Sequence, residues 1–119
     1  MSVSDITSRA EEENSNTIRE RVQMAVERQR FRNKSRTAPG GFVFNSALAQ
    51  RDLNSICEID RKSRDFLARA ITQFNFSARA YSRILRLSRT IADLIGSEKI
   101  LLDHISEAVR YRLPISMTS

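Results

Sequence analysis

Four arginines lie within the fourteen-residue segment SARAYSRILRLSRT, residues 77–90. On a helix of about 3.6 residues per turn, Arg79, Arg83 and Arg86 share one stripe at positions i, i+4 and i+7. Arg89 follows beside the stripe, and Asp93 is its expected ion-pair partner one turn further on. Guanidinium groups bind phosphate oxygens well, so this stripe is a candidate contact for an anionic partner.

The stripe has two interpretations. Like charges at i and i+4 cost a helix only about 0.2–0.5 kcal/mol per pair, which a solvated surface tolerates. Alternatively, the anionic oxygens of a partner lie opposite the stripe. Arg79 favours a partner, because it falls in the first turn of the expected helix, where the dipole and free N–H groups already attract an anion. Spacing alone leaves both interpretations open.

Several catalytic chemistries lack their residues in this sequence. It contains no GxxxxGK[ST] loop and no GxGxxG turn. His104 is the only histidine and Cys57 the only cysteine, which excludes a histidine-based triad and a multi-ligand zinc site. We expect His104 to pack or cap and Cys57 to lie in the core. The acidic residues are expected to be solvated or to cap helices, namely Asp60, Asp65, Asp93, Asp103 and Glu107. The chain by itself is not expected to be an enzyme.

Composition favours one soluble helical domain. The 119 residues are 40% hydrophobic and 29% charged, with three Gly, two Pro and no Trp. The sequence has no apolar run of about 18 residues, so no membrane partner is expected. A single cysteine and no apolar secretory core predict a cytoplasmic protein. The net charge of +6 favours a phosphate-bearing or acidic partner.

The N-terminal third is expected to hold one helix and a linker. Residues 1–13 are predicted to form a flexible arm, and residues 14–45 a helix followed by a Pro/Gly linker. Thr17 and Glu20 have the spacing of a capping box, which predicts a helix over 17–32. Its apolar stripe is thin, as in a helix that lies against something else. Linker residues follow at 39–41, and a short strand at 42–44 has only weak support.

Residues 46–113 are predicted to form a small helical bundle, with a flexible tail over 114–119. One or two short helices are expected over 48–59, followed by a helix that Asp60 caps. The clearest helix runs over 78–95, between the cap residue Ser77 and the C-cap residue Gly96, with Ile84, Ile91 and Ile95 among its apolar positions. A last helix over 102–112 stops before Pro114. The predicted fold class is all-α, a bundle preceded by an additional N-terminal helix.

Residues 76–112 read FSARAYSRILRLSRTIADLIGSEKILLDHISEAVRYR. This segment resembles the pattern LSARAYxRILRxARTIADLxGSExIxxxHxxEAxxYR of the C-terminal domain of magnesium chelatase-like AAA+ ATPases, a family that includes a ComM-type competence branch. Two upstream stretches also resemble the family, NSNTIRERVQMAVERQ and the region from Asn45 to Asp60. The resemblance covers about residues 14–112. It departs from the pattern at Ser88, at Leu101 and in the tail after residue 112.

The resemblance implies the helical lid of a AAA+ ATPase, whose sensor-2 arginine reaches the terminal phosphates of the nucleotide. By position in the motif this residue is Arg79, and Arg83 and Arg86 are weaker candidates for nucleotide binding. The implied cofactors, ATP and Mg, belong to a parent protein, and this fragment is not expected to bind them tightly. The implied partners are an upstream AAA+ core of the same chain, a ring homo-oligomer, and a remodelled DNA or chelatase partner.

An alternative from the residues themselves is a stand-alone basic helical module that binds nucleic acid directly. A third is a purely structural adaptor.

The phosphate-binding loop, the acidic Mg-coordinating residues and the arginine finger of the family are missing from this sequence. The chain is therefore expected to be part of a longer ATPase.

Overall fold

The computed structural model describes residues 3–34 and 40–112, with side chains from residue 14 onward. These residues form α1 (Val3–Arg32), a 3-10 turn η1 (Asn45–Ala47), α2 (Gln50–Ile56), α3 (Arg61–Phe74), α4 (Ala78–Ile95) and α5 (Leu102–Arg112). Within this part of the chain the only strand-like feature is one bridge between Lys34 and Phe42, where a short strand had weak support. The predicted all-α class is confirmed.

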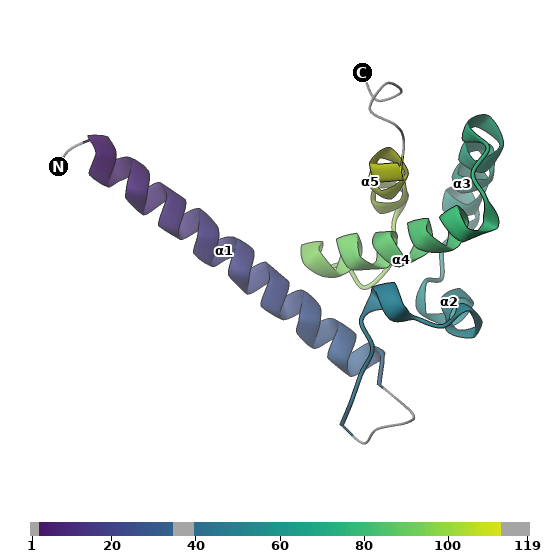
Figure 1. Cartoon of the computed structure of the whole chain (residues 1–119), viewed down its shortest axis with the longest axis horizontal. Helices are drawn as coiled ribbons and strands as arrows, with labels where there is room; N and C mark the ends of the chain where they lie inside the picture. Colours follow the sequence, from purple (N-terminus) through teal and green to yellow (C-terminus); the bar gives the residue numbers. More distant parts are fainter. Residues whose placement is uncertain (1–2, 35–39, 113–119) are drawn as a thin grey trace.

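Helix α4 is the centre of the bundle. It packs against α1, η1, α2 and α5, and α3 packs against α5. Figure 1 shows α1 running diagonally past one end of α4, with its N-terminal part extending away from the other helices. The core lies between α2, α3, α4 and α5, and its largest fully buried apolar side chains are Leu53, Leu67, Ile84 and Ile105.

The sequence signals at the ends of α3 and α4 are confirmed. The Asp60 carboxylate accepts a hydrogen bond of 2.8 Å from the backbone N–H of Ser63 and so caps α3. The Ser77 hydroxyl accepts one of 3.1 Å from the N–H of Ala80 and caps α4. Helix α4 ends at Gly96, whose φ of 88° lies in the left-handed region that favours glycine. The Ser77 cap fixes the first turn of α4, which carries Arg79.

The N-terminal helix is longer than predicted. It begins at Val3 rather than Thr17, so the predicted start of this helix is wrong, and residues 3–13, predicted as a flexible arm, are helical. The physical reason is that propagating a helix costs little, and no Gly or Pro interrupts residues 3–16. The division at 45/46 stays a prediction. Residues 1–2, Pro39, Pro114 and the 114–119 tail lie outside the described residues.

Within residues 14–32, α1 packs on the bundle through its C-terminal part. Ala25 and Gln29 are buried, whereas Ile18 and Val22 are exposed. The thin apolar stripe of α1 agrees with this arrangement, in which few side chains of residues 14–32 are covered. In α4 the apolar residue Ile95 does not join the core: it is the last residue of the helix and is 65% exposed.

Cys57 and His104 take the roles predicted for them. Cys57 is buried in the core, and this burial raises the pKa of its thiol to about 11. His104 is also buried, and its Nδ1 accepts a hydrogen bond of 2.9 Å from the backbone N–H of Leu101. This bond satisfies a donor at the start of α5, where Leu101 has no side-chain oxygen to act as a cap.

Candidate functional site

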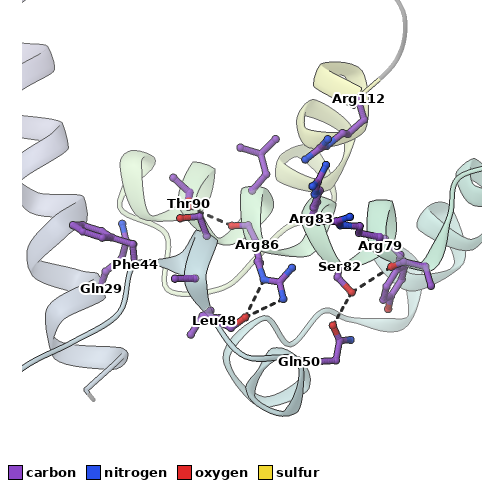
Figure 2. A pocket seen from close by; sticks show the side chains of 15 residues that line it. Gln29, Phe44, Leu48, Gln50, Arg79, Ser82, Arg83, Arg86, Thr90 and Arg112 are labelled. Carbon is purple, nitrogen blue, oxygen red and sulfur yellow. Dashed lines mark hydrogen bonds between the residues drawn. The ribbon is translucent and has the colours of Figure 1, made fainter. Parts of the chain in front are cut away.

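A groove of about 1070 Å³ runs along α4. Residues of η1 and α2 line it on one side, and the last turn of α5 lines it on the other (Figure 2). Four of its lining residues are arginines, namely Arg79, Arg83, Arg86 and Arg112. No Asp or Glu is among the lining residues. The groove is therefore a concentrated positive site that suits phosphate oxygens and does not suit a metal cation.

Arg79 and Arg83 are the exposed groove cations that α4 contributes. Arg79 lies in the first turn of α4, next to the Ser77 cap, and its side chain is solvent-exposed. Arg83 follows one turn later and is also exposed. Neither residue forms an ion pair with a carboxylate within the described part of the chain. Both guanidinium groups are thus exposed in the groove, and their contact with nucleotide stays a prediction.

Arg86 has a different environment from the other two arginines of the stripe. It is half-buried, and its Nε and Nη2 donate hydrogen bonds of 3.1 and 2.9 Å to the backbone carbonyl of Leu48. This two-pronged contact ties α4 to the segment between η1 and α2. Arg86 therefore has a structural role, while its contact with nucleotide stays a prediction.

A second contact fixes the same wall of the groove. The Ser82 hydroxyl, on the turn between Arg79 and Arg86, donates a hydrogen bond of 3.0 Å to Oε1 of Gln50 in α2. Figure 2 shows this bond and the Arg86 bonds on the same side of α4. The chain leading into α2 is therefore held to α4 at two points, Leu48 and Gln50, which fixes this wall of the groove.

A buried polar cluster lies at the opposite end of α4, and it corrects one prediction. Asp93, expected on a solvated face, is fully buried. Its carboxylate accepts a hydrogen bond of 3.0 Å from Arg89 Nη2, one of 3.1 Å from Arg32 Nη1 and one of 2.8 Å from Asn45 Nδ2. A second Arg32 nitrogen, Nη2, also contacts the carboxylate. The expected pairing of Arg89 with Asp93 is confirmed, and the partners from α1 and η1 are additional.

Arg89 is a structural residue of this cluster. Its Nη1 and Nη2 donate hydrogen bonds of 2.9 and 2.8 Å to the carbonyls of Glu98 and Ser97, which hold the α4–α5 connection. Burial lowers the pKa of the Arg89 guanidinium, and the charge of Asp93 opposes this effect. A buried guanidinium with these partners does not reach an external ligand, so Arg89 does not belong to the groove.

The cluster also fixes α1 to α4. Arg28 Nη1 donates a hydrogen bond of 3.0 Å to the backbone carbonyl of Asp93. Gln29 Oε1 accepts one of 2.8 Å from the N–H of Asn45. A Cβ added at Gly96 would lie 3.2 Å from Arg28 Nη2, so α1 passes close to the glycine that ends α4. The additional N-terminal helix therefore packs on this bundle, a question that the sequence left open.

Sequence reasoning missed Arg112 as a groove residue and Arg32 and Asn45 as partners of Asp93. Arg32 and Asn45 lie 61 and 48 residues before Asp93, so no helical spacing connects them. Arg112 falls in the YR pair at the end of the family pattern, which was the only signal available for it. Within residues 14–34 and 40–112 there is no cluster of three or more metal-ligating side chains. None of the described helices has the length and apolar character needed to cross a membrane.

The fold and the groove define an all-α domain with a four-arginine surface. The family described as "Magnesium chelatase, subunit ChlI C-terminal" matches residues 12–112, and the chain belongs to this family. It is 38% identical over 73 residues to the competence protein ComM of Haemophilus influenzae, a match that covers 61% of this chain and 14% of that protein. It is 32% identical over 100 residues to the uncharacterized protein YifB of Escherichia coli, covering 84% of this chain and 18% of that protein. The chain thus corresponds to a small part of these relatives, and it is similar to the C-terminal domain of magnesium chelatase-like ATPases.

Proposed function

We propose that this domain is the lid of a AAA+ ATPase and that Arg79 contacts the terminal phosphates of the nucleotide. The observation that carries the proposal is the position of Arg79. Its exposed guanidinium lies in the first turn of α4, at a groove lined by three further arginines and no carboxylate. Family membership over residues 12–112 supports the same role.

The lid would respond to nucleotide through its own residues. When bound, ATP with Mg would supply the phosphoanhydride bond that is hydrolysed. The terminal phosphate of ATP carries the negative charge that Arg79 would recognise. Arg79 gains a charge-assisted hydrogen bond while that phosphate is attached and loses it after hydrolysis. Such a differential contact shifts the population of lid orientations.

Movement of α4 would pass to α1. The two helices share the buried cluster around Asp93, which includes Arg32 of α1. Helix α4 is 18 residues long, so Arg79 and Asp93 are about 21 Å apart along its axis. A rigid helix with a contact at each end couples a phosphate contact at one end to the position of α1 at the other.

The partners of this lid follow from the same proposal. They are a AAA+ core of the same protein and neighbouring copies in a ring. ATP-driven movement would remodel a DNA or a chelatase partner, and the fold does not choose between these two. A cytoplasmic location is part of the proposal.

A second candidate function is direct binding of nucleic acid. It is favoured by the net charge of +6 and by the four cations of the groove. Phosphate contacts of this kind would give an affinity that falls steeply with salt concentration.

A hybrid ATPase tests the proposed role of Arg79. In this hybrid the present chain replaces the matching segment of the Haemophilus ComM relative, and steady-state ATP hydrolysis is measured with and without Arg79→Ala. We expect hydrolysis to fall at least tenfold while nucleotide still binds, because a phosphate contact made during the reaction is lost. Arg83→Ala removes the same charge one turn away and should have a smaller effect. Equal turnover in the Arg79→Ala hybrid and its parent would show that Arg79 is not a sensor.

A further inference from the structure

Arg112 is the only groove arginine that does not come from α4. It is exposed in the last turn of α5, a helix that packs against α4. Figure 2 shows the side chains of Arg112 and Arg83 directed toward one another across the groove. Two guanidinium groups that face each other from separate helices repel. An anion bound between them would offset this repulsion and accept hydrogen bonds from both.

A comparison with Arg110 shows that the helix dipole alone does not explain why Arg112 lies at the groove. Both arginines lie in the last turn of α5, where a positive charge interacts favourably with the helix C-terminus. Arg110, however, lines a different depression, together with Asp103 and Glu107. Arg112 lines a surface without carboxylates. Among the described residues Arg112 forms no ion pair.

We propose that Arg112 is a further phosphate-binding residue, which acts with Arg79 and Arg83 to hold the polyphosphate chain of a nucleoside polyphosphate. This inference rests on the proposed function and deepens it, because it adds α5 to a contact that the family pattern places on α4. Arg79 and Arg83 lie one turn apart on α4 and Arg112 lies on α5, so a chain of two or three phosphates offers oxygens to all three arginines, whereas a single phosphate would bind only the arginines nearest to it. The ligand class is therefore a polyphosphate rather than a single phosphate or sulfate.

The contact would give α5 a part in the response of the lid. Removing the terminal phosphate shortens the anion from three phosphates to two, so at least one of the three arginines on α4 and α5 loses its contact. Since α4 and α5 also share the core around Ile84 and Ile105, a change at the groove alters the packing between two helices rather than one surface side chain.

Calorimetric titration of the full 119-residue chain with inorganic tripolyphosphate at low salt tests the inference. We expect saturable binding that Arg112→Ala weakens about three- to tenfold, the loss of one charge-assisted contact at an exposed site. Arg110→Ala is the matched control and should weaken binding less than twofold. Arg112→Lys should give an intermediate affinity, because it keeps the charge and loses the planar fork. Circular dichroism verifies that each variant remains folded.

Several outcomes would overturn the inference. Equal effects of Arg112→Ala and Arg110→Ala would mean that only net charge matters. No saturable binding of tripolyphosphate at millimolar concentration would remove the groove as a polyphosphate site. Tighter binding of short duplex DNA than of tripolyphosphate at physiological salt would assign the groove to nucleic acid instead. A hybrid ATPase that responds to Arg79→Ala and not to Arg112→Ala would leave the lid function intact while refuting the role of Arg112.

Discussion

Replacing Asp93 with alanine should be among the most damaging single changes in the described part of the chain. The Asp93 side chain is fully buried at the end of α4, where it accepts hydrogen bonds from Arg32, Arg89 and Asn45. Asp93→Ala leaves the buried guanidinium of Arg89 without its counter-charge. It also leaves the amide of Asn45 without one of its acceptors. The change therefore removes the charge that holds three segments together.

The size of the effect follows from the burial of these partners. Removing one member of a buried, hydrogen-bonded ion pair costs about 3–5 kcal/mol. Arg89 is 4% exposed and belongs to that class, whereas the Arg32 side chain is 25% exposed and contributes less because water screens it. A domain of this size is stable by only about 5–15 kcal/mol. We therefore expect Asp93→Ala to lower the free energy of unfolding by about 3–5 kcal/mol and the melting temperature by ~10–25 °C.

Urea unfolding followed by far-UV circular dichroism measures the change. Asp65→Ala is the matched control, because Asp65 is an exposed carboxylate of α3 without an ion pair in the described residues, and its loss should cost less than about 0.5 kcal/mol. In a double-mutant cycle, Asp93→Ala and Arg32→Ala should be non-additive by at least about 0.5 kcal/mol. A stability loss from Asp93→Ala no larger than that from Asp65→Ala would refute the reasoning.

Three further predictions concern local features. Stability should fall as pH rises from about 9 to about 11, because burial raises the folded-state pKa of Cys57 from 9.0 to about 11. The neutral thiol stabilises the fold below that window, and this contribution is lost as the thiol ionises. Urea titrations at each pH should show a smaller fall in stability for Cys57→Ala. Ser77→Ala should cost about 1 kcal/mol by the same assay, because it removes the acceptor for the Ala80 N–H, whereas a loss below about 0.3 kcal/mol would deny the cap. Gly96→Ala should lower stability by about 1 kcal/mol or more, because φ is 88° and the new Cβ would crowd Arg28, and an unchanged melting temperature would contradict this account.

Local sequence signals were sufficient to predict α3, α4 and their caps. Asp60, Ser77 and Gly96 act on backbone groups within three or four residues, so their chemistry is readable along the chain. The extension of α1 to Val3 was not readable in the same way. A capping box at Thr17 indicates a possible start, but nothing in the preceding residues forces a helix to stop there.

The candidate site was predictable only where its residues are related by spacing along one helix. Arg79 and Arg83 stand out because they share a helix face with each other, and both are exposed in the groove. Arg86 shares that face too, yet its contact with Leu48 depends on how the η1–α2 segment folds back. Arg112 joins the groove only because α5 packs across α4. Tertiary packing of this kind has no periodic signature in one sequence.

A residue-resolved amide NMR titration of this chain tests the central claim most directly. The chain is titrated with Mg-ATP and, separately, with short duplex DNA at low and physiological salt. Our account predicts weak shifts from Mg-ATP that centre on residues 78–83, disappear in Arg79→Ala and persist in Arg110→Ala, with no DNA binding at physiological salt. Saturable DNA shifts along Arg79, Arg83 and Arg86 at that salt, without a response to Mg-ATP, would contradict it and make the domain a nucleic-acid-binding module.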